Sequence, residues 1–446
     1  MAITNADRPE TTAANDGVAW AGTPSKPFAT PNLGRTVRIV GPVENVDPNQ
    51  TPHAKAGRGE LGKAVFHWRN NHVSDDPLAR VAYDTHAADP NNHINTVLRK
   101  GASGNVNPRR VPVPDPAAMA RHIKQVARDF GADVVGVADT HPAYMFNGTY
   151  MDDKFATGGA LPEEVEALAR KLPYIIVATS SWDYDLGRAH RHHVGDAAYD
   201  FTLLKTSMIY SALEGYIREM GYTALRNAVN PQAAALAAGI GELGRNGMII
   251  TEQHGARVHM YDAILTDLPL VADKPLDIGV EDFCKVCRKC ATTCPTNSIT
   301  FDDKVVFNGV EKYKINWETC YKLRPLVADH WGQCLTCVAV CPYTKPNVWW
   351  RTLAVQALKR TPIPFRPVIV RGLKWLDDTF WGVAPRKRVR WLGYDSGIKP
   401  GEKVCTVAGC TADHGAVGQP KIDVLLEDIG FYMPLKENTN RFVKRG

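Results

Sequence analysis

The sequence predicts an α+β protein in which an α/β-type core is followed by a small inserted module rich in cysteine. Helix-like and strand-like segments alternate over residues 111–270, and eight of the ten cysteines fall between residues 284 and 341. The length of 446 residues allows two or three domains and a large core. We therefore expect four parts, an irregular N-terminal arm (1–110), the core (111–270), the cysteine module (271–346) and a basic, aromatic C-terminal segment packed on the core (347–446).

Composition excludes several broad classes. Apolar residues make up 44% of the chain and charged residues 22%, which is typical of a globular protein. The 53 basic and 47 acidic residues give a formal charge of +6, too small on this length to indicate nucleic-acid binding. No apolar run approaches the ~18 residues that a membrane span needs. The N-terminus lacks the basic and apolar regions of an export signal, so we expect a cytoplasmic protein without a membrane anchor.

The core elements follow from capping residues and apolar spacing. Asp115 and Pro116 begin a helix whose apolar residues recur at helical spacing until Gly131 ends it. Short apolar runs predict strands, and amphipathic or alanine-rich runs predict helices. In chain order we expect a strand at 134–138, a helix at 162–171, a strand at 174–178, a long helix at 196–220, a helix at 232–238 and a strand at 248–251.

The two ends of the chain are harder to interpret. Residues 1–110 are rich in Asn, Asp, Pro and Gly, which fits either an extended arm over the core or partial disorder. Residues 351–391 carry ten basic and two acidic residues interleaved with tryptophans. Four of the basic residues form a possible steering patch for an acidic partner, namely Arg386, Lys387, Arg388 and Arg390.

The cysteines form two related motifs. The first is Cys284-x2-Cys287-x2-Cys290-x3-Cys294-Pro, which is the bacterial ferredoxin run, and the second ends in Cys334-x2-Cys337-x3-Cys341-Pro with Cys320 before it. In that run three thiolates hold one [4Fe–4S] cluster and the fourth ligates the other cluster. The reciprocal pattern predicts one cluster on Cys284, Cys287, Cys290 and Cys341, and another on Cys320, Cys334, Cys337 and Cys294.

Zinc is the competing interpretation of these motifs, but paired zinc sites do not need two trailing Cys-Pro elements. In a chain without an export signal, patterned cysteines indicate metal binding rather than disulfides. The remaining two, Cys405 and Cys410, are expected to be ordinary thiols rather than a third metal site.

A glycine loop precedes the cysteine module. Gly239, Gly241 and Gly244 match the dinucleotide fingerprint, but a helix-like run precedes the loop and a strand-like run follows it, the reverse of the order required. Two interpretations remain. The glycines allow tight packing between elements, or they let the backbone approach a flat cofactor.

Taken together, these motifs resemble the cobalamin-dependent reductive dehalogenases. The resemblance rests on the run from Ala238 to Thr251, on Thr266-Asp-Leu-Pro-Leu270, and on Phe283 with the two cluster motifs. It covers residues 115–350, and the more distant epoxyqueuosine reductases share the plan less closely. It implies a nitroreductase-like core that binds a base-off corrinoid, with one cluster beside it. The absence of an Asp-x-His-x-x-Gly element agrees with base-off binding.

The resemblance also implies an activity and partners. Electrons from a separate ferredoxin or flavodoxin would pass through the two clusters to cobalt, and Co(I) would replace the halogen of a small organohalide by hydrogen. The residues expected to contact the cofactor are Gly239, Gly241, Gly244, Arg245, Asn246 and Trp349. Neither the particular organohalide nor the oligomeric state follows from the sequence.

The expected proton donor departs from the family pattern. The position of the family's tyrosine acid is Leu203, and the arginine that often lies two residues after the match to Arg257 is His259. Tyr199 lies one helical turn before Leu203 and, with His259, is our preferred donor. Further candidates are Lys205, Arg257 and the neighbouring His190, His192 and His193, although a polar loop is the expected place of these three histidines.

Because leucine cannot donate a proton, two other functions stay open. One is a corrinoid and iron–sulfur reductase of a non-halogenated substrate, such as an epoxide or a modified nucleoside. The other is a non-catalytic electron-transfer or corrinoid-carrying protein.

Overall fold

A computed structural model gives the fold. It describes residues 27–63, 65–66, 105–146, 165–190, 192–226, 228–260, 262–324, 333–346, 348–382, 390–391 and 394–395. Cys405, Cys410, Arg386, Lys387 and Arg388, and the side chains of Arg390 and His193, lie outside the described residues.

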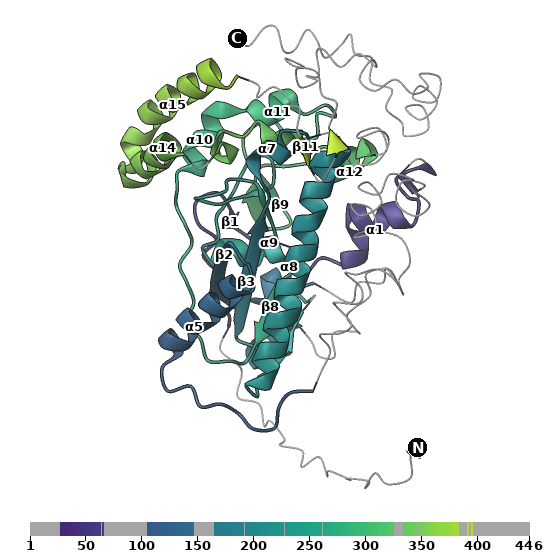
Figure 1. Ribbon diagram of the computed structural model, residues 1–446, viewed down its shortest axis with the longest axis vertical. Helices are drawn as coiled ribbons and strands as arrows, with labels where there is room; N and C mark the ends of the chain where they lie inside the picture. Colours follow the sequence, from purple (N-terminus) through teal and green to yellow (C-terminus); the bar gives the residue numbers. More distant parts are fainter. Residues whose placement is uncertain are drawn as a thin grey trace. The chain divides into compact units, whose positions relative to one another are not determined.

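A five-stranded antiparallel sheet forms the centre of the core (Figure 1). Its strands run in the order β2-β3-β8-β4, and β7 pairs with the far end of β3. The strands are β2 (Val134–Asp139), β3 (Tyr174–Ser181), β4 (Ala224–Leu225), β7 (Val258–His259) and β8 (Ile264–Thr266). The predicted mixture of helices and strands is confirmed. The α/β-type description of the core is wrong, because every ladder of this sheet is antiparallel and parallel pairing defines that class.

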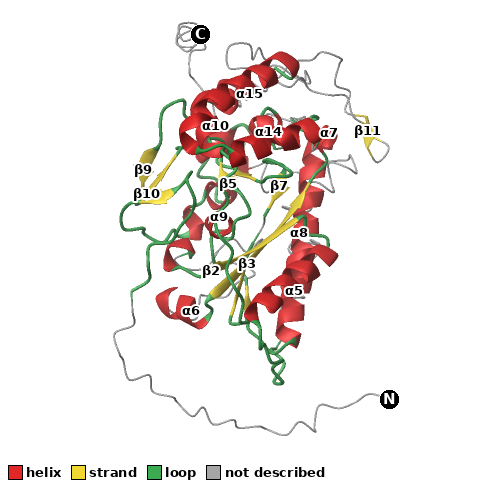
Figure 2. Ribbon diagram, turned by 90° about the vertical axis from the view of Figure 1, so that its left-hand side faces the viewer, coloured by secondary structure: helices red, strands yellow, loops and turns green. Residues whose placement is uncertain are grey.

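Helices cover both faces of the sheet (Figure 2). One face packs on α5 (Pro116–Asp129) and the long α8 (His193–Glu219), whose buried Ile123 and Leu213 belong to the main apolar core. The other face packs on α9 (Pro231–Ala237). Two further helices, α6 (Val165–Lys171) and α7 (Tyr184–Gly187), lie beside β3 in sequence.

Tyr210 connects α8 to the middle of β3. Its hydroxyl donates to the Ala178 carbonyl and accepts from the Ala178 N–H, both at 2.9 Å. Ala178 lies between the part of β3 that pairs with β8 and the part that pairs with β7, so its backbone has no strand partner on that side. The tyrosine therefore supplies hydrogen bonds that the sheet lacks there.

The predicted elements are confirmed with small shifts. Asp115 caps α5 by accepting from two backbone N–H groups, as its sequence position predicts. The long helix begins at His193, three residues before the predicted start, because the His192 ring caps it. Gly221 ends it at φ 84°, a left-handed conformation that favours glycine. The expected strand at 248–251 is β6 (Ile249–Ile250), paired with β5 (Glu242–Leu243).

The cysteine module lies beyond one end of the central sheet (Figures 1 and 2). It contains α10 (Val280–Cys287), α11 (Lys289–Thr293), α12 (Trp317–Lys322) and α13 (Thr336–Ala339). Its hairpin of β9 (Val305–Phe307) and β10 (Val310–Lys312) pairs with β1 (Arg38–Ile39) from the N-terminal part. The module is followed by α14 (Trp349–Arg360) and α15 (Arg366–Phe380), and by the small hairpin of β11 (Arg390–Trp391) and β12 (Tyr394–Asp395).

The described part of the N-terminal segment contacts the rest of the chain rather than standing apart. Besides β1 it contains α1 (Pro52–Gly57), and Leu33 and Val37 are buried. Arg35 forms an ion pair with Asp282 of α10 at 2.6 Å. The remaining short elements are the 3-10 turns at Pro48–Gln50, Pro142–Tyr144, Pro342–Thr344 and Ile363–Phe365. None of the described helices is both long and apolar enough to cross a membrane.

Replacing Tyr210 with Phe should lower stability by about 1–3 kcal/mol, because two buried backbone groups lose their partner. Thermal unfolding of the anaerobically purified protein measures the effect. Tyr216→Phe is the matched control on the same helix, where a partly exposed hydroxyl contacts His122 and its loss should cost less. Equal losses in the two variants would contradict the role given to Tyr210.

Candidate iron–sulfur and cofactor site

The structure sorts the eight motif cysteines into two groups. In the first thiol group Cys341 interacts electrostatically with Cys284, Cys287 and Cys290. In the second thiol group Cys337 and Cys320 interact with Cys334 and Cys294. The structure thus brings together the two sets named from the sequence. Among the described residues, no three His, Cys, Asp or Glu side chains lie close enough to hold a single metal ion.

The first thiol group surrounds a small void. All four of its cysteines line this space, together with Arg245, Asn246, Phe283 and Tyr343. Burial raises the pKa of these thiols, and their mutual repulsion raises it further. Iron binding therefore has to displace protons from the thiols. The two groups are neighbours, since Cys290 and Cys337 pack against the same small apolar cluster.

Arg245 attaches the glycine loop to the cysteine module. It is 1% exposed, and its guanidinium donates to the carbonyls of Cys284 at 3.2 Å, Thr300 at 2.9 Å and Asp302 at 2.7 Å. It also stacks over the Tyr313 ring at 3.9 Å. Asn246 donates to the Cys337 carbonyl at 3.3 Å. These two residues, named from the sequence as cofactor contacts, bind the backbone of the module.

The glycines of the loop are explained by protein packing. An added Cβ at Gly239 would overlap the Lys274 carbonyl, and one at Gly241 would overlap the Ile250 carbonyl. At Gly244 it would come within 2.6 Å of the Asn246 side chain. Packing within the chain therefore explains why these positions are glycine. Contact of the loop with a flat cofactor stays a prediction.

A large aromatic cavity lies on another side of the first thiol group. Its volume is about 650 Å³, and it shares Phe283, Pro342 and Tyr343 with the wall of the smaller void. Helices α14 and α15 supply most of the remaining wall, which is apolar except for Arg351 and Asp377. Trp349, the remaining cofactor contact named from the sequence, lines this cavity and is 76% exposed. Trp350 and Trp381 line it as well, with ring centroids 6.1 Å apart.

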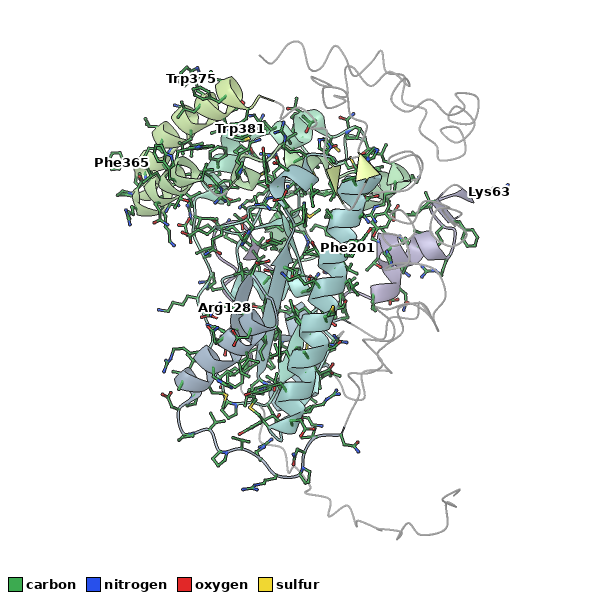
Figure 3. All side chains as sticks on the ribbon, viewed as in Figure 1. Lys63, Arg128, Phe201, Phe365, Trp375 and Trp381 are labelled. Atoms are coloured by element: carbon green, nitrogen blue, oxygen red, sulfur yellow. The ribbon has the colours of Figure 1, made fainter. Side chains whose placement is uncertain are left out.

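Figure 3 shows how the same two helices present further apolar side chains. Phe365 and Trp375 point outward from this part of the molecule, whereas Trp381 lies closer in. Trp375 is exposed, and the α15 residues that are buried include the charged Arg366 and Asp377. The helix therefore buries two charged side chains beside the apolar Val370 and leaves Trp375 on the surface.

The structure places the two preferred proton donors in contact. The rings of Tyr199 and His259 meet edge to face with centroids 4.9 Å apart, and Trp182 meets the other side of Tyr199 at 5.4 Å. Burial lowers the pKa of His259 to about 3, so its ring is neutral at pH 7. Burial raises the pKa of Tyr199, which keeps its proton. Neither residue lines the aromatic cavity or the two smaller voids beside it.

The other candidates have different surroundings. Arg257 donates to the Thr344 carbonyl at 3.3 Å and to the Trp182 carbonyl, which ties β3 to the cysteine module. Lys205 has a side chain that is 46% exposed, and its ammonium lies 3.9 Å from Asp133. The expectation of a polar loop is wrong for His190, which is buried with Nδ1 3.2 Å from the Thr336 hydroxyl.

Sequence reasoning missed several residues of this site. Trp182 contacts Tyr199, and Lys345 and Arg351 are buried beside the cavity and the Cys341 end of the module. The sequence feature that could have pointed to Lys345 is its position four residues after Cys341, at the end of the Cys-Pro turn. No periodicity or motif pointed to Trp182 or Arg351.

Comparison with known proteins shows which family model the cysteine module matches and which proteins the chain is similar to. Residues 283–345 match a protein-family model described as a 4Fe-4S dicluster domain. Over 270 residues the chain is 31% identical to tetrachloroethene reductive dehalogenase of Sulfurospirillum multivorans, covering 54% of this chain and 53% of that protein. The chain is a homologue of the reductive dehalogenases.

Further relatives agree with this homology. Tetrachloroethene reductive dehalogenase of Desulfitobacterium hafniense is 28% identical over 324 residues, which are 63% of this chain and 55% of that one. An epoxyqueuosine reductase of Atelocyanobacterium thalassa is more distant, at 24% over 254 residues, 51% of this chain and 80% of that one. The chain spans about half the length of the reductive dehalogenases it matches.

Solved structures show the same fold. A catabolic reductive dehalogenase matches with a TM-score of 0.63 at 21% identity, covering 86% of this chain and 53% of that one. Another matches with a TM-score of 0.62 at 21% identity, over 84% and 52%, and its title concerns a mechanism for B12-dependent dehalogenation.

Replacing Arg245 with Met should detach the loop from the module, because three backbone carbonyls lose a charged donor, each such bond contributing about 1.5–3 kcal/mol. We expect a lower unfolding temperature and loss of iron from the reconstituted protein, measured by calorimetry and iron analysis. Arg371→Met, an exposed change on α15, is the control. If both variants keep their iron equally well, Arg245 does not hold the module.

Proposed function

We propose that the protein is a corrinoid- and iron–sulfur-dependent reductive dehalogenase that replaces a halogen of a small organohalide by hydrogen. One observation carries the proposal. A dicluster module places four thiols around a void that shares Phe283 and Tyr343 with a large aromatic cavity. A cluster in the void would lie next to whatever fills the cavity. The homology to reductive dehalogenases and the proposed nitroreductase-like core agree with this arrangement.

The ligands of the two [4Fe–4S] clusters are the two thiol groups. The first cluster would be held by Cys284, Cys287, Cys290 and Cys341, and the second by Cys320, Cys334, Cys337 and Cys294. Backbone N–H groups support both sets, since Arg245 donates to Cys284 Sγ at 3.5 Å and Ser298 to Cys294 Sγ at 3.3 Å. Such bonds stabilise the negative charge of a cluster.

The aromatic cavity fits the ring of a cobalamin. Its volume is in the range of cofactor sites, and its flat aromatic walls suit a large, flat and mostly apolar ring. Trp349, Trp350 and Trp381 would hold the faces of the ring, and Arg351 offers a donor for an amide at its rim. When bound, a base-off corrinoid supplies the reduced cobalt that breaks the carbon–halogen bond.

Tyr199 and His259 are the proposed source of the proton. The Tyr199 phenol keeps its proton at neutral pH and is oriented by His259 on one side and Trp182 on the other. The neutral His259 ring positions the phenol rather than acting as a cationic acid. Trp182 also lines a narrow gap with Arg257 and Thr344.

A second candidate is the reduction of a non-halogenated substrate, as in the epoxyqueuosine reductases. Leu203 favours this candidate. It occupies the position of the family's tyrosine acid, is 2% exposed, and has no acidic group that could donate a proton. Electron transfer or corrinoid carriage without catalysis is a third possibility on the same ground. In each case electrons would come from a separate ferredoxin or flavodoxin.

The decisive experiment is anaerobic reconstitution with iron, sulfide and cobalamin, followed by a screen for halide release from aryl and alkyl halides with a chemical reductant. We expect about eight irons and eight sulfides, about one corrinoid with a base-off Co(II) spectrum, and halide release. Cys287→Ala is the control and should lose one cluster and the activity. Full cofactor content with no halide released from any compound, but with reduction of an epoxide, would favour the second candidate. Zinc without iron uptake would refute both.

Replacing Tyr199 with Phe should slow single-turnover product formation by roughly 10²-fold or more, because the carbon left by the halide loses its positioned acid. Tyr216→Phe on the same helix controls for the substitution itself. Both variants are compared at equal iron and corrinoid content. Product formation by Tyr199→Phe at the parent rate would show that the phenol is not the acid.

A further inference from the structure

The two thiol groups have different electrostatic surroundings. Among the described residues, four cations interact with the cysteines of the first group, namely Arg245, Lys289, Lys345 and Arg351. The described anions beside this group are Asp377 and Asp378, which both pair with Lys289, and, farther along the Tyr343 side, Glu242. Glu242 accepts from the backbone N–H groups of Ile278 and Val280, which offset its charge at the start of α10. The first group therefore lies in a region of excess positive charge.

Lys345 is the most unusual of these cations. It is 1% exposed, and its ammonium makes no hydrogen bond among the described residues. The nearest carboxylate oxygen, Asp377 Oδ1, is 4.0 Å away, and the Trp381 ring lies at 5.4 Å. Asp377 is already paired with Lys289, whose ammonium also donates to the Gly382 carbonyl at 2.9 Å. Lys345 is thus a buried cation whose charge the protein leaves largely uncompensated.

The Cys-Pro element explains how Lys345 comes to this place. Pro342 begins a 3-10 turn after Cys341, and the Thr344 N–H returns to the Cys341 carbonyl at 2.9 Å. The turn brings residue 345 back beside the thiol four positions earlier. An ammonium held there is attracted by the negative charge of a cluster on Cys341 and, after reduction, by one more unit of it.

The second thiol group has fewer cations. Arg324 interacts with Cys320, and two buried carboxyl groups one helical turn apart on α8, Asp196 and Asp200, interact with the same arginine. Asp196 also accepts from the backbone N–H of Gln333, directly before Cys334. Burial raises the pKa of both carboxyl groups, so neither counts as a full counter-charge. Arg324 is thus the one described cation that interacts with the second group, against four for the first.

The thiols of the first group also accept more backbone N–H hydrogen bonds than those of the second group. In the first group three backbone N–H groups donate to thiols, from Arg245, Lys289 and Tyr343, and the Thr344 hydroxyl donates to Cys341. In the described part of the second group one backbone N–H, that of Ser298, donates to Cys294. Two hydroxyl groups also contact thiols there, Thr296 at Cys294 and Thr336 at Cys334. Both cation excess and N–H···S bonds raise the potential at which a cluster accepts an electron.

We propose that Lys345 and its neighbouring cations make the cluster of the first thiol group the more easily reduced of the two, so that an electron entering at the second cluster passes toward the aromatic cavity. The inference rests on the proposed cluster assignment. Each transfer moves one electron from the reduced second cluster to the oxidised first cluster and requires no proton. Lys345 acts here as a positioning residue through its charge, without touching a substrate.

The test is a redox titration of the reconstituted protein followed by electron paramagnetic resonance. We expect two one-electron waves, and the wave at higher potential should be the one that disappears in Cys287→Ala. Lys345→Gln should shift that wave to lower potential and leave the other in place, at unchanged iron content. Lys345→Arg, which restores the charge, should return the wave toward its original position.

Arg121→Gln is the control, because it removes one positive charge from a side chain on α5 that is 72% exposed and paired with Asp115 at 3.9 Å. Its waves should not move. The proposal is wrong if Cys287→Ala removes the lower-potential wave, or if Lys345→Gln with full iron content leaves both waves unchanged. If Lys345→Gln binds too little iron, Lys345→Met and Lys345→Arg give the same comparison. The titration needs neither corrinoid nor organohalide, so its outcome is independent of whether dehalogenation occurs.

Discussion

The attachment of the glycine loop to the cysteine module through Arg245 is the interaction on which the rest of the site depends. A fully buried guanidinium is costly, and here three backbone carbonyls accept from its Nε and Nη1 while the Tyr313 ring stacks over it. Its Nη2 has no hydrogen-bond partner among the described residues. The same backbone segment directs an N–H at Cys284 Sγ. One residue therefore both fixes the module to the core and supplies part of the polar environment of its thiols.

The glycines beside Arg245 serve the same contact. They let the loop approach the carbonyls of Lys274 and Ile250 more closely than any side chain allows. The sequence showed that something had to come close to this loop, but it contained no information on whether that was a cofactor or the chain itself. The structure shows that the chain itself comes close at these glycines, because an added Cβ would overlap its own atoms.

Local elements were predictable where one residue determines them. Asp115 and Pro116 begin α5, and Gly221 ends α8. The cysteine spacing predicts the same two thiol groups that the structure brings together. Strand direction was not predictable, because a helix between two strands suggests a parallel crossover while β2 and β3 pair antiparallel. The aromatic cavity was not predictable either, because its walls come from α10, α14, α15 and the Cys-Pro turn, which are far apart in sequence. The sequence named Trp349 as a cofactor contact, but it did not show that α14 and α15 form the cavity that this residue lines.

The substitution at Leu203 and the contact of Tyr199 with His259 are best understood together. Leu203 is buried, so a tyrosine there would have faced protein rather than solvent. Tyr199, one turn earlier on the same helix, faces His259 at the end of β7, where β7 pairs with Ser180 of β3. A phenol moved by one helical turn requires a matching change on the facing strand. A neutral histidine meets that requirement, because its ring packs edge to face on Tyr199 without bringing a charge into this buried place. The departures from the family pattern at positions 203 and 259 are therefore consistent with one displaced donor rather than with two independent losses.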